Sequence, residues 1–167
     1  MHTAPPVDFS ESIGCDPPRW ISNNNYYRCL FRRKFEIPPL KVYTLKVITD
    51  FAAAHSLRGY AGDCRRLHGH NWKVEVEITT TVLDQCGMGV DFKVIKKATQ
   101  SIVRELDHHY LNEIPPFDKV NPTAENIAAY LFQGISRILG DGQIQVSAVT
   151  LWETERACVR YQENNTP

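Results

Sequence analysis

The stretch Cys64-Arg-Arg-Leu-His-Gly-His-Asn-Trp-Lys-Val-Glu-Val-Glu-Ile78 organises the chain, because it joins a histidine motif to a strand pattern. Apolar and polar residues alternate from Trp72 onward, which is typical of a β-strand with one buried face. His68 and His70 share the parity of Trp72, so both imidazoles project from one side if the strand reaches back to them. With a third histidine from a neighbouring strand, such a pair can bind zinc and leave a fourth position open.

His55 is the candidate third ligand, since it gives three histidines within sixteen positions. An open fourth position is typical of catalytic zinc, whereas structural zinc usually has four protein ligands. The alternative is that these histidines are hydrogen-bonded packing residues, and the spacing alone leaves both interpretations open.

Composition places the chain among ordinary compact domains. It has 167 residues, 43% of them hydrophobic, and a formal net charge of zero, so no global field favours nucleic acid or an anionic membrane. No apolar run approaches the ~18 residues of a membrane span, and the N-terminus lacks the features of a signal peptide. Five cysteines without a C-x-x-C pair predict a reduced, cytoplasmic protein with no disulfide framework.

Residues 1–40 differ from the rest, since they hold six of the ten prolines and no helical or strand period. Residues 28–35 mix basic and aromatic side chains. We favour a solvated arm that folds back on its own subunit over a contact with nucleic acid or an acidic partner. The expected organisation is an extension over 1–40, one domain over 41–163 and a tail over 164–167.

The patterned region predicts four strands. The first covers residues 42–49 and continues to His55, and the second covers about 70–82. Strands at about 143–152 and 157–161 close the chain, with two helices between the strand pairs. The order β-β-α-α-β-β favours an α+β fold, with an antiparallel four-stranded sheet covered by the helices on one face.

The two helices are predicted from caps and apolar stripes. Asp91 is a candidate N-cap for the first helix, and either Asn121 or Thr123 could cap the second. The expected buried residues recur at helical spacing. They are Phe92, Ile95, Thr99, Ile102, Val103 and Leu106 in the first helix, and Ile127, Leu131, Ile135 and Ile138 in the second.

Cys64 is the first candidate for chemistry outside the histidines. Arg65 and Arg66 follow it directly, and neighbouring positive charge favours a thiolate. The alternative role is that of a small buried hydrophobe, which is common for free cysteines.

Two carboxylates are further candidates. Asp107 precedes His108, and a carboxylate that holds an imidazole fixes its tautomer, although a helix C-terminus also favours histidine. Glu153 follows an apolar strand, where it could accept two parallel N–H donors from a planar heterocycle or be an exposed strand end. His109 is interpreted as structural.

Taken together, these segments resemble the 6-pyruvoyl-tetrahydropterin synthase superfamily, most closely its bacterial 6-carboxytetrahydropterin synthase (QueD) branch. The resemblance covers about residues 41–163, and the three residues between Cys64 and His68 are similar to that branch, since animal pyruvoyl enzymes have a longer spacer. Another branch has glutamate in place of the cysteine, and residues 1–40 lie outside the family pattern. The segments that carry it are Phe51-Ala-Ala-Ala-His55, Cys64-x-x-x-His68-Gly-His70, Val90-Asp91-Phe92, Leu106-Asp-His-His-Tyr-Leu-Asn112, Asn121-Pro-Thr-Ala-Glu-Asn126 and Trp152-Glu153-Thr154.

The resemblance implies a tunnelling fold (T-fold), in which strand pairs from several subunits close a β-barrel and active sites lie at subunit interfaces. It implies a homo-oligomer built on trimers, including hexamers. By position, the implied Zn²⁺ ligands are His55, His68 and His70, the implied proton acceptor is Cys64, and its partner dyad, supplied by a neighbouring subunit, is Asp107 with His108. The implied pterin anchor is Glu153, with Thr123 in the region of pterin contacts.

The implied reaction converts 7,8-dihydroneopterin triphosphate to 6-carboxytetrahydropterin, acetaldehyde and triphosphate, on the route to 7-deazaguanine compounds such as queuosine. One alternative is a 6-pyruvoyl-tetrahydropterin synthase, which eliminates triphosphate but keeps the side chain. An alternative of another class is a non-catalytic, zinc-stabilised oligomer that holds a partner through residues 1–40. That protein would have no need of Cys64 or Glu153.

Overall fold

The computed structural model of the protein describes residues 40–140 and 144–163. The predicted extension, apart from Leu40, and the predicted tail lie outside these residues. Among the described residues, no helix is long and apolar enough to cross a membrane.

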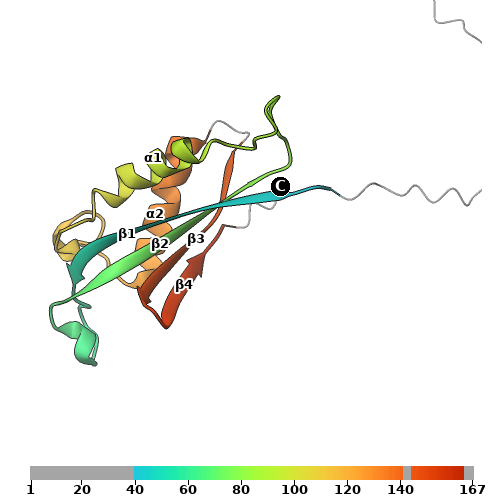
Figure 1. Ribbon diagram of the computed structural model, residues 1–167. Coiled ribbons are helices and arrows are strands. Elements are labelled where there is room, and N and C mark those ends of the chain that lie inside the picture. The colour runs from blue at the N-terminus through green and yellow to red at the C-terminus, as the bar shows by residue number, and fades with distance from the viewer. Residues whose placement is uncertain (1–39, 141–143, 164–167) are drawn as a thin grey trace, which may run out of the picture. The chain divides into compact units, whose positions relative to one another are not determined.

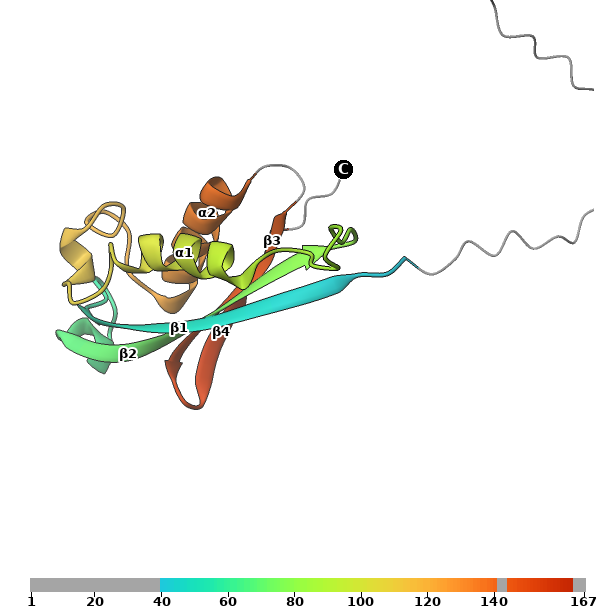
Figure 2. The same cartoon turned by 45° about the horizontal axis from the view of Figure 1, so that its top comes forward.

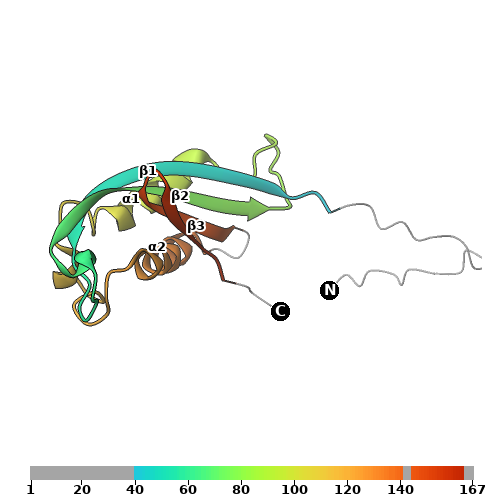
Figure 3. The same cartoon turned by 90° about the horizontal axis from the view of Figure 1, so that it is seen from below.

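The sheet has four antiparallel strands in the order β1-β2-β3-β4. Both helices lie on one face of it, as the views in Figures 1, 2 and 3 agree. The predicted α+β architecture and element order are therefore confirmed, whereas the barrel oligomer stays a prediction. The elements are β1 (Tyr43–His55), β2 (His68–Thr80), α1 (Phe92–Val103), α2 (Ala124–Leu139), β3 (Gln145–Thr154) and β4 (Ala157–Tyr161), with short 3₁₀ helices at Asp63–Arg65 (η2) and Leu111–Glu113 (η3).

The alternation along β2 determines which face is buried. Its apolar residues, from Trp72 to Ile78, have no exposed surface and face the helices. The intervening charged residues pair on the other face, where Lys46 contacts Glu75 at 2.8 Å and Arg160 contacts Glu77 at 3.0 Å. A sheet with one apolar and one charged face has to be covered on one side, and α1 and α2 provide that cover.

The predicted caps are present. Asp91 accepts a hydrogen bond from the Lys93 amide at 2.8 Å and begins α1. Thr123, rather than Asn121, caps α2 by accepting from the Asn126 amide at 3.3 Å.

Two of the residues predicted to be buried are not. Phe92 is 48% exposed because it is the first residue of α1, and Ile138 is 50% exposed because the apolar stripe of α2 continues in a step of four to Leu139. Leu106 is buried as predicted, but it lies beyond the end of α1 at Val103.

Two strands are displaced from their predicted bounds. β2 begins at His68 because His55 and its predecessors in β1 pair with it to the end. β3 continues to Thr154, which pairs with Ala157 across the turn to β4.

Candidate active site

The pairing of β1 with β2 brings three histidines together at one end of the sheet. His55 lies directly opposite His68, and His70 lies opposite Ala53. The ring centroid of His55 lies 4.4 Å from that of His68 and 5.2 Å from that of His70. The centroids of His68 and His70 are 5.0 Å apart. All three side chains continue the face that carries the core, since the Trp72 ring packs edge-on against His55 at 5.2 Å and His70 at 5.1 Å.

Backbone carbonyls orient two of these rings. Nδ1 of His55 donates to the Pro122 carbonyl at 2.7 Å, and Nδ1 of His68 donates to the Arg66 carbonyl at 2.8 Å. With the proton on Nδ1, a neutral imidazole presents a bare lone pair at Nε2, which is the form that binds a metal.

The Nε2 atoms of all three histidines are buried and have no hydrogen-bond partner in the described part of the chain. Burial lowers the pKa of His55 and of His70, which favours the neutral, ligating form of each. Buried polar atoms are nearly always satisfied, so three that converge without a hydrogen-bond partner fit a bound metal cation. Imidazole donors in this number suit zinc.

Glu153 joins this cluster. Its Oε1 lies 3.4 Å from Nε2 of His70 and 3.7 Å from Nε2 of His55. One donor atom from each of the three histidines and from Glu153 lies within 4.8 Å of the others. Sequence reasoning placed Glu153 with the substrate and not with the metal.

A clamp between two loops supports His55, and sequence reasoning missed it. The backbone N–H of Arg58 donates to Oδ1 of Asn121, whose Nδ2 donates back to the Arg58 carbonyl, both at 2.8 Å. The Arg58 guanidinium also donates to the carbonyls of Phe117 at 2.7 Å and Val120 at 2.6 Å. The clamp therefore holds the chain just before Pro122, whose carbonyl orients His55. The Asn121-Pro122-Thr123 motif was noted for capping, but nothing in the sequence pairs it with Arg58.

Cys64 lies in η2 and is half-buried. Its carbonyl accepts from the Leu57 amide at 2.8 Å, which closes the loop between β1 and β2. Cys64 is not a member of the four-residue cluster.

Asp107 and His108 are in contact, with Oδ1 of Asp107 2.8 Å from Nδ1 of His108. The same oxygen accepts from the Ala52 amide at 3.0 Å, and this backbone hydrogen bond is the main reason that the pKa of Asp107 lies below its usual value. His108 adopts a left-handed backbone with φ of 60°, and its amide donates to the Ala52 carbonyl at 2.6 Å. Such a conformation persists only when neighbouring contacts hold it.

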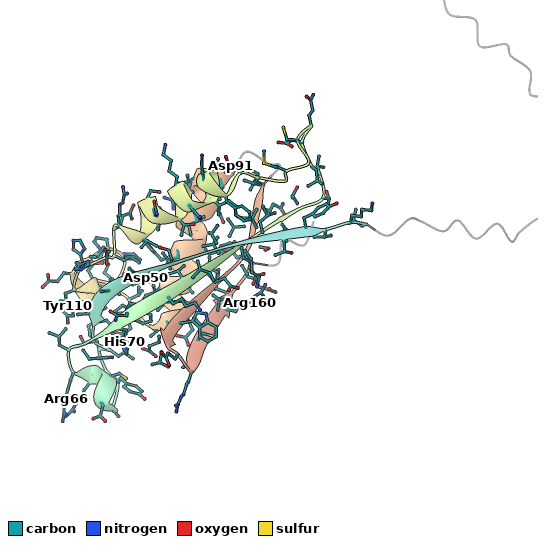
Figure 4. The ribbon with its side chains drawn as sticks, viewed as in Figure 1. Asp50, Arg66, His70, Asp91, Tyr110 and Arg160 are labelled. Carbon is teal, nitrogen blue, oxygen red and sulfur yellow. The ribbon has the colours of Figure 1, made fainter. Side chains whose placement is uncertain are left out.

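The dyad points outward. The His108 side chain is 81% exposed, although residues 107–109 are tied to the free edge of β1. His108 and His70 both line an open groove of about 560 Å³ that also includes Tyr110. Figure 4 shows His70 and Tyr110 at the same end of the sheet, with Arg66 beyond them.

Thr123 is half-buried, and its hydroxyl is used by the N-cap of α2. A hydroxyl that accepts in a cap can still donate to a ligand. The structure thus gives Thr123 a structural role, and its predicted pterin contact stays a prediction.

The sheet, its two helices and the histidine cluster define the class of protein as a tunnelling-fold domain with a candidate metal centre. A sequence model of the 6-pyruvoyl tetrahydropterin synthase family matches residues 44–164, and the chain belongs to this family.

Two relatives and one solved structure show what the chain is similar to. It is 35% identical over 117 residues to the 6-carboxy-5,6,7,8-tetrahydropterin synthase of Synechocystis sp., covering 67% of this chain and 87% of that protein. It is also 35% identical over 104 residues to the dihydroneopterin monophosphate aldolase of Pyrococcus furiosus, covering 62% and 83%. The structure of Caenorhabditis elegans 6-pyruvoyl tetrahydropterin synthase superposes with a TM-score of 0.68 at 25% identity, covering 75% of this chain and 98% of that one.

Proposed function

We propose that the protein is a zinc-dependent 6-carboxy-5,6,7,8-tetrahydropterin synthase, which acts on 7,8-dihydroneopterin triphosphate and releases acetaldehyde and triphosphate. The observation that carries the proposal is the convergence, at the end of β1 and β2, of three buried Nε2 atoms that have no hydrogen-bond partner among the described residues. Membership of the family and the named Synechocystis relative support the choice of substrate.

His55, His68 and His70 would hold the zinc. When bound, zinc supplies Lewis-acid polarisation of substrate oxygens. The backbone carbonyls of Pro122 and Arg66 keep two of the rings turned so that Nε2 faces the metal position.

Cys64 and the Asp107–His108 dyad would move the protons. Asp107 is held ionised by the Ala52 amide and orients the His108 ring through Nδ1, as a general acid–base pair requires. The outward His108 side chain is available to a second copy of the chain, so we propose that one subunit supplies Cys64 and its neighbour the dyad. This requires a homo-oligomer with interfacial active sites.

Glu153 would bind the pterin ring, since a carboxylate can accept two parallel N–H bonds from a planar heterocycle. Thr123 would lie beside the ring. Glu153 is about one-third exposed, at the mouth of the histidine cluster.

Product analysis tests the proposal. Zinc-loaded protein is incubated with 7,8-dihydroneopterin triphosphate, and we expect 6-carboxytetrahydropterin, acetaldehyde and triphosphate in equal amounts. Triphosphate without acetaldehyde would show the pyruvoyl reaction instead. A phosphorylated two-carbon aldehyde would show aldol cleavage, a second candidate that the Pyrococcus furiosus relative favours. No product at all would favour the non-catalytic alternative.

A further inference from the structure

We propose that Glu153 is a fourth protein ligand of the metal in the substrate-free subunit, and that the substrate displaces it. The first half concerns this chain alone, whereas the displacement rests on the proposed function. The open fourth position expected from the sequence is then closed at rest and opens when substrate binds.

The contacts of Glu153 are not those of hydrogen bonds. The 3.7 Å between its Oε1 and Nε2 of His55 is too long for one. Because Nδ1 of His55 donates to Pro122, a neutral ring directs a lone pair, and no proton, toward this carboxylate. A lone pair and a carboxylate that face one another repel, and a bound metal cation would turn that repulsion into attraction.

Two of the separations are close to those expected in a coordination shell. Donor atoms about 2.0–2.2 Å from a tetrahedral zinc lie roughly 3.3–3.6 Å from each other. The distances from Oε1 to Nε2 of His70, 3.4 Å, and to Nε2 of His55, 3.7 Å, are close to that range.

The fold directs Glu153 to this place. Trp152 pairs with Cys158 and Thr154 pairs with Ala157, so Glu153 is the extra residue of a β-bulge between them. The bulge shifts the register with β4 without ending β3, which continues to Thr154. By parity Glu153 continues the face of Leu151, which is fully buried, and that face carries the histidines.

Glu153 is also the cluster member best able to leave. His55 and His70 lie within paired strands, and their side chains are 2% and 20% exposed, whereas that of Glu153 is 33% exposed. It lies one residue from the end of β3, next to the turn into β4. A carboxylate there can rotate from the metal to a pterin ring without movement of the sheet.

Metal binding without substrate tests the first half. The full chain and its Glu153→Gln variant are compared for zinc affinity by chelator competition, and for the visible spectrum of the Co²⁺ form. Glu155→Gln, an exposed carboxylate two residues away, is the matched control. We expect Glu153→Gln to weaken zinc binding by about 10- to 100-fold or more, since even outer-shell partners are worth that much, and to change the Co²⁺ spectrum. Glu155→Gln should match the unmodified protein in both. If Glu153→Gln also matches it, Glu153 is not a ligand.

Neopterin triphosphate, the fully oxidised analogue of the substrate, tests the displacement. At saturation, the Co²⁺ spectra of the unmodified protein and of Glu153→Gln should converge, because the Glu153 carboxylate has left the metal in the unmodified protein and is absent from the variant. Spectra that stay as different as before addition would show that Glu153 is not displaced. If the metal experiments succeed but product analysis finds no turnover, the proposed function fails and the ligand assignment stands.

Discussion

The histidine cluster and the Asp107–His108 dyad lie at the same end of the molecule but are built in opposite ways. In the cluster, His55 is buried, its Nδ1 is fixed by a backbone carbonyl, and its Nε2 points at two other rings. In the dyad, His108 is held by Asp107 and by its own backbone amide, and 81% of its side chain is exposed. One chain therefore brings together all four side chains that could hold a metal, whereas the imidazole of the dyad is left open to a neighbouring molecule.

The largest effect is expected from His68→Ala. This change removes one of the proposed ligands from the histidine cluster. Zinc content should therefore fall from about one per subunit to nearly none, and turnover should fall with it. We expect a loss of affinity above 100-fold, since weaker outer-shell changes already cost about 10- to 100-fold. Metal analysis after gel filtration measures it.

His109→Ala is the control for that change, because His109 lies outside the cluster and its Nδ1 donates to the nearby Asp107 carbonyl at 2.7 Å. It should keep its zinc. Full zinc in His68→Ala would mean that the cluster is a packing arrangement.

Cys64→Ala should lower turnover without lowering zinc content, and so distinguish proton transfer from metal binding. Turnover should fall by about 10²–10⁴, the usual worth of positioned acid–base catalysis, while zinc content should not change, because Cys64 is not in the metal cluster. Steady-state kinetics and metal analysis on one preparation give both values. Cys86→Ala is the control, because Cys86 is an exposed cysteine outside the candidate site. Near-native turnover in Cys64→Ala would move the role of base to His108.

Mixing two variants tests whether the Asp107–His108 dyad of one subunit acts in the active site of a neighbouring subunit. Cys64→Ala and His108→Ala are each expected to be nearly inactive. If each site takes its cysteine and its dyad from different subunits, random co-assembly should restore about a quarter of the unmodified activity. Activity that stays at the level of the separate variants after co-refolding would show that each site is formed within one subunit.

The same comparison explains what the sequence could predict. The element order, the parity of His68 and His70 and the Asp91 cap follow from local patterns, and all are present. His55 lies opposite His68 because β1 and β2 pair antiparallel, and strands that follow one another in the chain usually pair in this way. The metal half was therefore largely predictable.

The missed features depend on contacts between distant segments. Glu153 reaches the cluster because β3 pairs with β2, and the Arg58–Asn121 clamp joins loops 63 residues apart. The exposure of Phe92 and Ile138 has local causes instead, since Phe92 is the first residue of α1 and the apolar stripe of α2 steps from Ile135 to Leu139. Neither the pairing of β2 with β3 nor the clamp has a periodic signal in the chain.

The smallest effect is expected from Thr123→Ala, which tests whether this residue belongs to the scaffold or to the site. The change removes the N-cap hydrogen bond to the Asn126 amide and should lower the free energy of unfolding by about 1 kcal/mol, measured by urea denaturation of the zinc-free protein. Zinc affinity should stay the same, because His55 is oriented by the backbone carbonyl of Pro122, which the Arg58–Asn121 clamp holds independently. Thr123→Ser keeps the hydroxyl and should restore the lost stability. If the Michaelis constant rises in Thr123→Ala and recovers in Thr123→Ser, the hydroxyl also contacts the pterin. If only stability responds, Thr123 is a capping residue and the pterin contact predicted for it is wrong.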